Sequence, residues 1–271
     1  MVMFKLGVIG GGAMGAALIG GVIRNGLISA DKIGLVEVDQ PRGQALQSNL
    51  GIQLFSSVAS MAAECQTIIL AIKPIQLFAI LTELGTQLCE KHLVISIAAG
   101  VPLAAMENSL PQARIVRVMP NTPARIGKGV SAYCLGQRAS GTDAEKVEAI
   151  FGCVGKVLRV SEDKLDAVTA VSGSGPAYVY YFIDALINAG VYLGLPRKDA
   201  AVLATETVLG AAELLKNSGE HPRQLMNEVT SPGGTTAAAL FEFEKAGFAG
   251  LVMQAAIAAA ERSREIGKGI R

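Results

Sequence analysis

Three glycine-rich turns in this chain each precede a run of helix-forming residues. They are residues 10–15, 172–176 and 231–236, and the last two also carry serine or threonine hydroxyls. Backbone N–H groups at the start of a helix carry a partial positive charge, so such turns can hold anions. We expect the two hydroxyl-bearing turns to share a small-anion site, with plain capped turns as the alternative.

The chain is poor in side chains that act as general bases. His92 and His221 are its only histidines, and no lysine occurs between Lys164 and Lys198. Hydride transfer involving an alcohol normally needs a strong base, commonly histidine or lysine. A C=N substrate fits this composition better, because an imine can bind already protonated and accept a hydride without a dedicated acid. With two histidines and no CxxC pair, the sequence indicates no metal site.

The first glycine turn matches the pattern G-x-G-x-x-G at Gly10, Gly12 and Gly15. It lies between an expected strand at residues 4–9 and an expected helix at residues 16–25. In this context the three glycines allow a tight turn, the approach of backbone to a pyrophosphate, and close packing of helix on strand. We predict a dinucleotide site here; the alternative is a tight turn without a ligand.

Strand-like runs alternate with helical stretches through the first half of the chain, and helices dominate the second half. The expected strands are residues 33–38, 67–72, 93–98 and 115–119, and the later helices are residues 177–193, 197–217 and 247–266. Alternation of this kind predicts an α/β fold with a mostly parallel sheet, a Rossmann-type domain, followed by an all-α domain. We place the dinucleotide-binding domain at residues 1–164 and the helical domain at residues 165–271.

Ligands on parallel sheets lie at the carboxyl ends of the strands, so the residues there are informative. Small or proline-rigid stretches follow three expected strands, which suits a flat ring lying on the backbone. Lys73 either lines a cofactor site or is a solvated loop residue. Asn121 either approaches the cofactor or caps a turn.

The end of the second strand bears on the choice of cofactor. Glu37 and Asp39 follow Gly15 by about 20 residues, where a carboxylate accepts from a ribose hydroxyl and repels a 2′-phosphate. Arg42 lies nearby and could attract that phosphate instead. Both acids could also be solvated, so the sequence leaves NAD(H) and NADP(H) open.

Composition narrows the range of partners. The net charge is +1 without basic or acidic tracts, which argues against nucleic acid or an anionic membrane as partner. Four widely spaced cysteines are typical of reduced thiols in a cytoplasmic protein. The uncharged run at residues 6–23 could pass for a signal peptide or membrane span, but seven of its eighteen residues are glycine. A buried strand, turn and helix explain it better.

The stretches GVIGGGAMG, AIKP, VISIAAG, RVMPNTPA, AVSGSGPAYVY and VTSPGGTTAAAL occur in that order. With them the chain resembles the pyrroline-5-carboxylate reductase family from about residue 5 to residue 266. The resemblance implies reduction of 1-pyrroline-5-carboxylate to proline with NADPH or NADH. It also implies a homodimer that interlocks through the C-terminal helices, alone or within a larger ring of dimers.

The resemblance also implies site residues. Those expected to bind the cofactor are Gly10, Gly12, Ala13, Met14, Gly15, Glu37, Lys73, Pro74, Ala98, Ala99, Gly100 and Asn121. Those expected to bind the substrate are Ser174, Ser231, Gly233, Gly234, Thr235 and Thr236. Thr236 would be the catalytic residue, with its hydroxyl directed at the imine nitrogen. Many relatives carry Ser, Thr, Asn or Arg where this chain has Glu37, so an NADPH preference does not follow.

Two other functions are weighed against this one. A 3-hydroxyacid dehydrogenase with a similar start needs a lysine on the helix that opens its second domain, and residues 165–197 contain none. A dinucleotide-binding regulator without catalysis has no reason to keep hydroxyls in the SPGGTT turn. Binding of NAD(P)H without turnover of any imine would favour the regulator.

Overall fold

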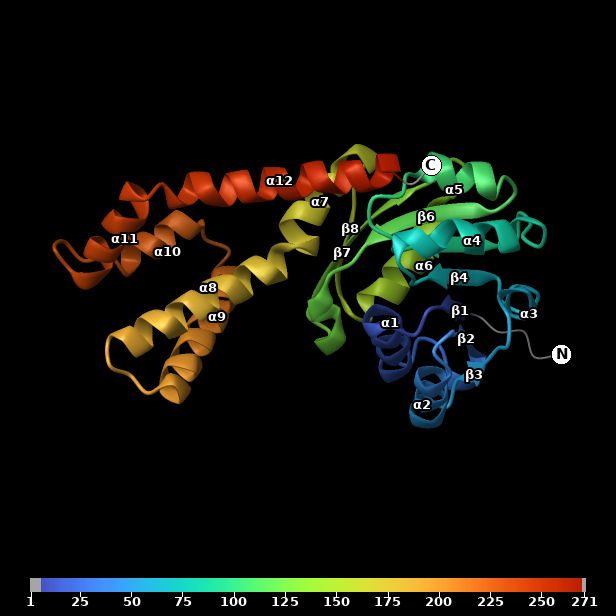
Figure 1. Cartoon of the computed structure of the whole chain (residues 1–271), viewed down its shortest axis with the longest axis horizontal. Coiled ribbons are helices and arrows are strands. Elements are labelled where there is room, and N and C mark those ends of the chain that lie inside the picture. The colour runs from blue at the N-terminus through green and yellow to red at the C-terminus, as the bar shows by residue number, and fades with distance from the viewer. Residues whose placement is uncertain (1–5, 270–271) are drawn as a thin grey trace. The chain divides into compact units, whose positions relative to one another are not determined.

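The computed structural model describes residues 6–269 of the chain and the side chains of residues 6–267. Two compact units are present: unit 1 is Met1–Ser174 with Ala258–Arg271, and unit 2 is Gly175–Ile257 (Figure 1). The compact units divide after Ser174 and after Ile257. These units are defined by contacts within one chain and not by function, so the expected boundary between functional domains at residues 164/165 stays a prediction. Among the described residues, none of the helices has the length and apolar character needed to cross a bilayer.

Unit 1 contains an eight-stranded sheet in the order β3-β2-β1-β4-β5-β6-β7-β8. The strands are β1 (Leu6–Ile9), β2 (Ile33–Val36), β3 (Gln53–Leu54), β4 (Thr67–Leu70), β5 (Leu93–Ser96), β6 (Arg114–Met119), β7 (Gly129–Leu135) and β8 (Gly155–Arg159). Every neighbouring pair is parallel except β6 and β7. The predicted mostly parallel sheet is confirmed, although residues 4 and 5 of its first expected strand lie outside the described residues.

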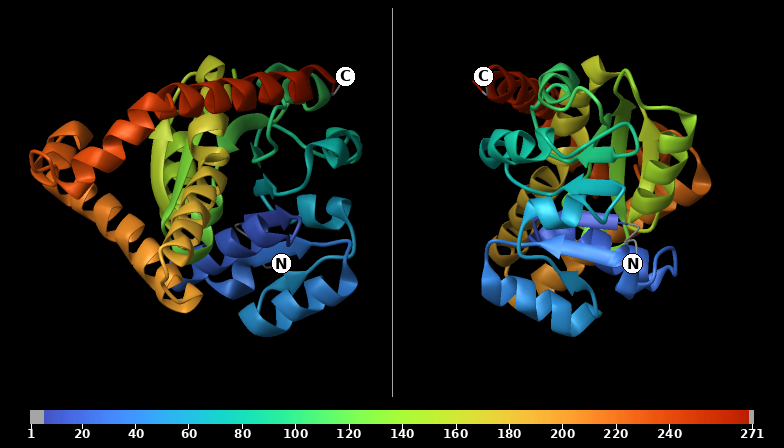
Figure 2. Two further views of the ribbon diagram at one scale, coloured as in Figure 1. Left: turned by 60° about the vertical axis from the view of Figure 1, so that its left-hand side comes forward. Right: turned by 90° about the vertical axis from the view of Figure 1, so that its right-hand side faces the viewer.

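Helices cover both faces of this sheet, as Figures 1 and 2 show. They are α1 (Ala13–Arg24), α2 (Gln40–Leu50), α3 (Val58–Ala62), α4 (Pro74–Gly85), α5 (Leu103–Ser109), α6 (Gly141–Gly152) and α7 (Leu165–Val168). Successive strand residues point to opposite faces, so Ile68 and Leu70 pack with Leu77 of α4, whereas Ile69 packs with Leu18 of α1. Both faces are therefore apolar, which explains why the central strands β1, β4 and β5 contain no charged residue.

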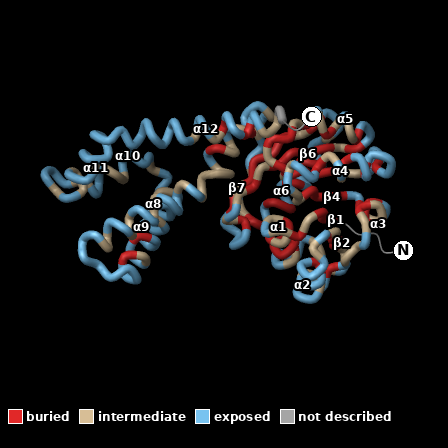
Figure 3. Tube along the Cα trace, viewed as in Figure 1, coloured by how far each residue is buried: buried red, intermediate tan, exposed pale blue. Residues whose placement is uncertain are grey.

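Unit 2 consists of helices. They are α8 (Gly175–Tyr192), α9 (Arg197–Ser218), α10 (Pro222–Glu228), α11 (Thr235–Lys245) and the first part of α12 (Phe248–Gly269). The predicted helical character of this half is confirmed. Its apolar side chains are mostly exposed, in contrast to those of unit 1 (Figure 3).

The last turns of α12 return to unit 1 and pack beside the loop after β5. A Cβ atom added to Gly267 would lie 2.3 Å from the carbonyl oxygen of Gly100, so these two backbones touch directly. The Ser263 hydroxyl, which is buried, donates to Asp166 at 2.6 Å. The end of α12 is thereby attached to the strand ends where a ligand is expected.

Candidate active site

The glycine turn between β1 and α1 has the geometry that its pattern predicts. Gly10 has φ +100°, and a Cβ atom there would lie 2.5 Å from the carbonyl oxygen of Ala71. A Cβ atom at Gly15 would lie 2.0 Å from the carbonyl oxygen of Gly10. Gly12, in contrast, has no atom within 4 Å of its Cβ position, and no side chain caps α1. Two glycines are thus required by packing, and the third leaves the helix N-terminus open to a ligand.

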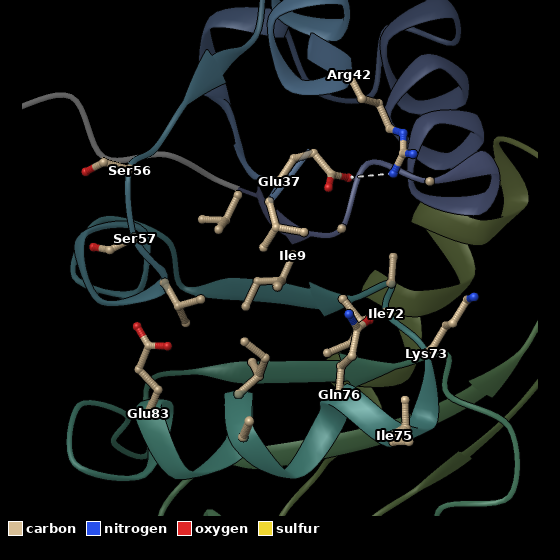
Figure 4. Close-up of a pocket in the computed structure, with 18 residues that line it drawn as sticks. Ile9, Glu37, Arg42, Ser56, Ser57, Ile72, Lys73, Ile75, Gln76 and Glu83 are labelled. Carbon is tan, nitrogen blue, oxygen red and sulfur yellow. Dashed lines mark hydrogen bonds and ion pairs between the residues drawn. The ribbon is translucent and has the colours of Figure 1, made fainter. Parts of the chain in front are cut away.

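A cavity of about 840 Å³ lies at the carboxyl ends of β1, β2 and β4. Figure 4 shows Lys73 and Ile75 toward one end of it and Ser56, Ser57 and Glu83 toward the other. Of the predicted cofactor residues, Gly10, Gly12, Glu37 and Lys73 line it. The remainder, namely Ala13, Met14, Gly15, Pro74, Ala98, Ala99, Gly100 and Asn121, are not among its lining residues, and their roles stay predictions.

Several residues that line the cavity were not predicted from the sequence. Ser56, Ser57 and Gln76 belong to this group. The first two follow β3, which has only two residues and therefore gives no hydrophobic pattern to detect. The signal available was Ser57 itself, whose hydroxyl caps α3 by accepting from the Ser60 N–H at 3.1 Å.

Glu37 is turned inward beneath the glycine turn. Its Oε2 accepts from the Gly11 N–H at 2.7 Å, and its Oε1 accepts from the Asp39 N–H at 2.9 Å. Glu37 is only 7% exposed, so it is not the solvated acid that the sequence allowed as an alternative. Its carboxylate holds the backbone of the glycine turn and still lines the cavity.

Arg42 is shared between two carboxylates. Its guanidinium lies 2.8 Å from Asp39 Oδ2 and 3.5 Å from Glu37 Oε2. Asp39 also begins α2, because its side chain accepts from the Arg42 N–H at 3.1 Å. The positive charge that could attract a 2′-phosphate is therefore already paired.

Lys73 and Pro74 begin α4 at the rim of the cavity. Pro74 occupies the first turn, where the missing N–H costs nothing. The Lys73 side chain is exposed and forms no ion pair with any residue that the structure describes. An anionic ligand in the cavity therefore has a cation available at this end.

The loops after β5 and β6 contain the predicted nicotinamide residues. Ala98 is buried, and its N–H donates to the Ser96 hydroxyl at 3.3 Å. Gly100 has φ +80°, a conformation that favours glycine. The Asn121 amide bonds to Val130 and to Ser172. Although Asn121 precedes the 3₁₀ turn η2 (Thr122–Ile126), its side chain does not cap that turn, so the capping alternative is wrong.

The SPGGTT turn lies in unit 2 and opens α11. Gly233 has φ +68°, and the Gly234 N–H donates to the carbonyl oxygen of Ser231 at 3.0 Å. The first bond into the helix runs from the Ala238 N–H to the Gly234 carbonyl, which leaves the N–H groups of the preceding turn without an intrahelical acceptor. No side chain caps α11.

The hydroxyls of this turn are also unused. No hydrogen bond joins the side chains of Ser231, Thr235 and Thr236 to other residues in the described part of the chain. Unpaired N–H groups and hydroxyls at a helix N-terminus are the parts of an anion site. The expected helix-opening turn at residues 172–176 is wrong: residues 169–173 already form a π-helical turn that leads into α8, and the Ser174 N–H donates to the Thr169 carbonyl.

A Rossmann-type sheet with an open glycine turn and a cavity at its strand ends is typical of a dinucleotide-binding protein. Residues 162–266 match the family described as pyrroline-5-carboxylate reductase dimerisation, and residues 5–100 match NADP oxidoreductase, coenzyme F420-dependent. The chain is 40% identical to the pyrroline-5-carboxylate reductase of Arabidopsis thaliana over 97% of its length and 95% of the relative's. It is 42% identical to the pyrroline-5-carboxylate reductase of Methanosarcina acetivorans, over 97% of this chain and 98% of the relative.

Solved structures agree with these relatives. A pyrroline carboxylate reductase of Plasmodium falciparum with NADP bound is 35% identical, with a TM-score of 0.88 over 98% of this chain and 99% of that one. The reductase of Coxiella burnetii is 34% identical, with a TM-score of 0.91 over 97% and 98%. The chain belongs to the pyrroline-5-carboxylate reductase family.

Proposed function

We propose which residues of this chain bind the cofactor, which bind the substrate and which take part in the reaction of its family. The chain is an oxidoreductase that reduces 1-pyrroline-5-carboxylate to L-proline with NAD(P)H, the final step of proline biosynthesis. The observation that carries this function is the match to reductases over nearly the whole chain, which includes both the open glycine turn and the SPGGTT turn.

Unit 1 holds the dinucleotide. The open N-terminus of α1 at Gly12 and the cavity at the strand ends fit such a group. Residues 10–15 bind the pyrophosphate through backbone N–H groups, and Lys73 adds a positive charge at the rim. Pro74, Ala98, Ala99 and Gly100 frame the nicotinamide. When bound, the reduced nicotinamide supplies the hydride that is added to the ring carbon C5.

The SPGGTT turn holds the substrate carboxylate. N–H groups at the start of α11 and the hydroxyls of Ser231 and Thr235 donate to its oxygens, with Gly233 and Gly234 providing the bend. Such charge-assisted bonds contribute about 1.5–3 kcal/mol each. The clamp orients C5, which is catalysis by positioning.

Thr236 and Ser174 are the remaining residues assigned to the substrate. The Thr236 hydroxyl oxygen accepts a hydrogen bond from the protonated ring nitrogen and fixes the plane of the ring, and Ser174 also binds the substrate. The substrate binds as the protonated imine, so the C=N electron pair passes to nitrogen as C5 gains the hydride. The product is the secondary amine of proline, and no side chain has to supply a proton.

The acids after β2 favour NADH over NADPH. Glu37 and Asp39 place two negative charges beside one paired Arg42, so a 2′-phosphate would enter a site with a net negative charge. Ribose hydroxyls can instead donate to the free lone pairs of Glu37. The structure with NADP bound is that of another member of the family, so it does not decide which cofactor this chain prefers.

Unit 2 forms a homodimer with a second copy of the chain. Its helices expose large apolar side chains, including Tyr181 at 81%, Tyr192 at 91% and Leu193 at 80%. Exposed apolar area of this kind marks an association surface. Light scattering during size-exclusion chromatography measures the mass and separates a monomer, a dimer and a ring of dimers; a monomer at micromolar concentration would overturn this part.

The assay of the function mixes the purified protein with 1-pyrroline-5-carboxylate and either NADH or NADPH, and follows cofactor oxidation. We expect oxidation with both and a higher kcat/KM for NADH. No oxidation with either cofactor would overturn the proposed reaction. Cofactor binding without turnover of any imine would instead support a regulator.

A further inference from the structure

A turn of π-helix, η4 (Thr169–Gly173), lies between α7 and α8. The Ser174 N–H donates to the Thr169 carbonyl at 2.8 Å, five residues back rather than four. Such single turns carry one extra residue, are rare, and occur frequently at functional sites. Because the α-helical alternative lies only one residue away in register, contacts from outside the helix must hold the π-turn.

Asn121 supplies such contacts through its amide. The Nδ2 group donates to the Ser172 carbonyl at 3.2 Å and lies 3.3 Å from the Ser172 hydroxyl oxygen. The Oδ1 atom accepts from the Val130 N–H at 2.8 Å. The orientation of the amide is settled by its partners, since only oxygen can face the Val130 N–H and only nitrogen can face the Ser172 carbonyl. Both donors of the amide are thereby used inside the protein.

Packing on the end of β6 restrains the same turn. A Cβ atom added to Gly173 would lie 2.5 Å from Cε of Met119, the last residue of β6. The Thr169 hydroxyl also donates to the Leu165 carbonyl at 2.8 Å, which ties the π-turn to α7. One face of the π-turn therefore lies against the strand end that Asn121 follows.

We propose that Asn121 is a positioning residue: its amide holds the π-turn on the end of β6 and so fixes residues 172–174 for the substrate. This inference rests on the proposed function, in which Ser174 binds the substrate. It replaces direct contact with the cofactor as the role of Asn121. Without the amide, the turn relaxes to α-helical bonding, and a shift of one residue rotates the Ser174 side chain by about 100° around the helix axis.

The variant Asn121→Asp tests this role with little change in size. An aspartate keeps an oxygen for the Val130 N–H but turns a second oxygen toward the Ser172 carbonyl, which it repels. We expect kcat/KM for the pyrroline to fall about tenfold or more, because small misplacements near the reacting atoms cost that much. The dissociation constant of NADH, measured by fluorescence titration without substrate, should stay within about twofold of the unmodified protein, as expected of a residue that does not touch the cofactor.

Two further variants and a second measurement keep the test decisive if Asn121→Asp folds poorly. An alanine at Gly173 would meet only the flexible end of Met119, so the larger Gly173→Val is used to push the π-turn away from β6; it should reproduce the kinetic signature, whereas Asn108→Ala, an exposed amide on α5, should change nothing. Hydrogen exchange of the peptide 165–175 should accelerate in Asn121→Asp, because the amide bonds that hold this segment on the end of β6 are lost and the segment opens more readily. This measurement stands even if the unmodified protein fails to reduce the pyrroline, an outcome that would sink only the proposed function.

Three results would overturn the inference. A weakened NADH affinity with an unchanged KM for the pyrroline would show that Asn121 contacts the cofactor. Unchanged kinetics and exchange would show that the amide positions nothing. A lower melting temperature with unchanged kcat and KM per folded molecule would show a purely structural role.

Discussion

Replacing Glu37 by glutamine separates two effects of the acid beneath the glycine turn. The change keeps the shape of the side chain and removes one negative charge from the cavity. Glu37 now accepts N–H groups from Gly11 and Asp39 with its two oxygens. A glutamine has only one oxygen, so its NH₂ group must face the other donor.

The two effects differ in which cofactor they touch. Loss of one charge-assisted hydrogen bond weakens the fold and the glycine turn by about 1.5–3 kcal/mol, and this affects both cofactors alike. The missing charge removes a repulsion on the 2′-phosphate of NADPH and weakens the hydrogen bond that a ribose hydroxyl of NADH would donate to Glu37, so both changes shift the ratio toward NADPH. For unit charges about 4 Å apart the repulsion is about 1 kcal/mol in water and about 4 kcal/mol at an effective dielectric of 20. Because the cavity is open to solvent, we take the lower end, a relative gain for NADPH of at least about fivefold.

Initial rates with both cofactors at saturating pyrroline measure this effect as the ratio of the two kcat/KM values. Asp39→Asn is the matched control, because it removes a charge that is 40% exposed and leaves the bond to Gly11 intact. It should shift the ratio less and keep the melting temperature, since asparagine also caps a helix. Suppose that Glu37→Gln changes the ratio of the two kcat/KM values by less than about twofold, well below the fivefold gain expected from charge repulsion. The Glu37 carboxylate then does not discriminate between a 2′-hydroxyl and a 2′-phosphate.

Three other outcomes follow from the geometry. Thr236→Val should lower kcat/KM for the pyrroline by about 10- to 1000-fold, roughly 1.4–4 kcal/mol, and unchanged kinetics would remove this hydroxyl from the mechanism. Gly15→Ala should lower the melting temperature because its Cβ meets the Gly10 carbonyl, whereas Gly12→Ala should weaken cofactor binding at unchanged stability; calorimetry and fluorescence titration distinguish them. Burial raises the pKa of Cys65 to about 12 and that of Cys134 to about 11, so at pH 8 both should resist alkylation until the protein unfolds, as mass spectrometry of labelled peptides can check.

The sequence predicts those parts of the fold that depend on local pattern. The five expected strands are all present in the described residues, because parallel strands buried on both faces are continuous apolar runs. β3, β7 and β8 were not predicted; β3 has only two residues, and the residues GKVLR of β8 are largely exposed and mix charged with apolar types. The antiparallel pairing of β6 with β7 also depends on long-range register that no local pattern records.

In the candidate site, too, features that depend on local pattern could be predicted, and features that depend on contacts between distant residues could not. Gly10, Gly12 and Gly15 could be assigned from spacing, because each role follows from backbone geometry in a strand-to-helix turn. The direction of the Glu37 side chain could not, since it depends on where the Gly11 N–H points in the folded chain. The partner of Asn121 lies 51 residues later, at Ser172, and only the folded chain brings the two together.

The shortage of charged groups in the SPGGTT turn has a physical consequence for the reaction. The substrate carries a carboxylate and, in the reactive form, a protonated imine within the same small ring. An arginine or lysine clamp on the carboxylate would place a full positive charge close to the iminium and disfavour its protonated form. The N-terminus of α11 offers a charge of only about +0.5, spread over several N–H groups. In the proposed function, such a clamp would bind the carboxylate through hydrogen bonds while leaving the imine protonated, which is the form that accepts a hydride without an acid.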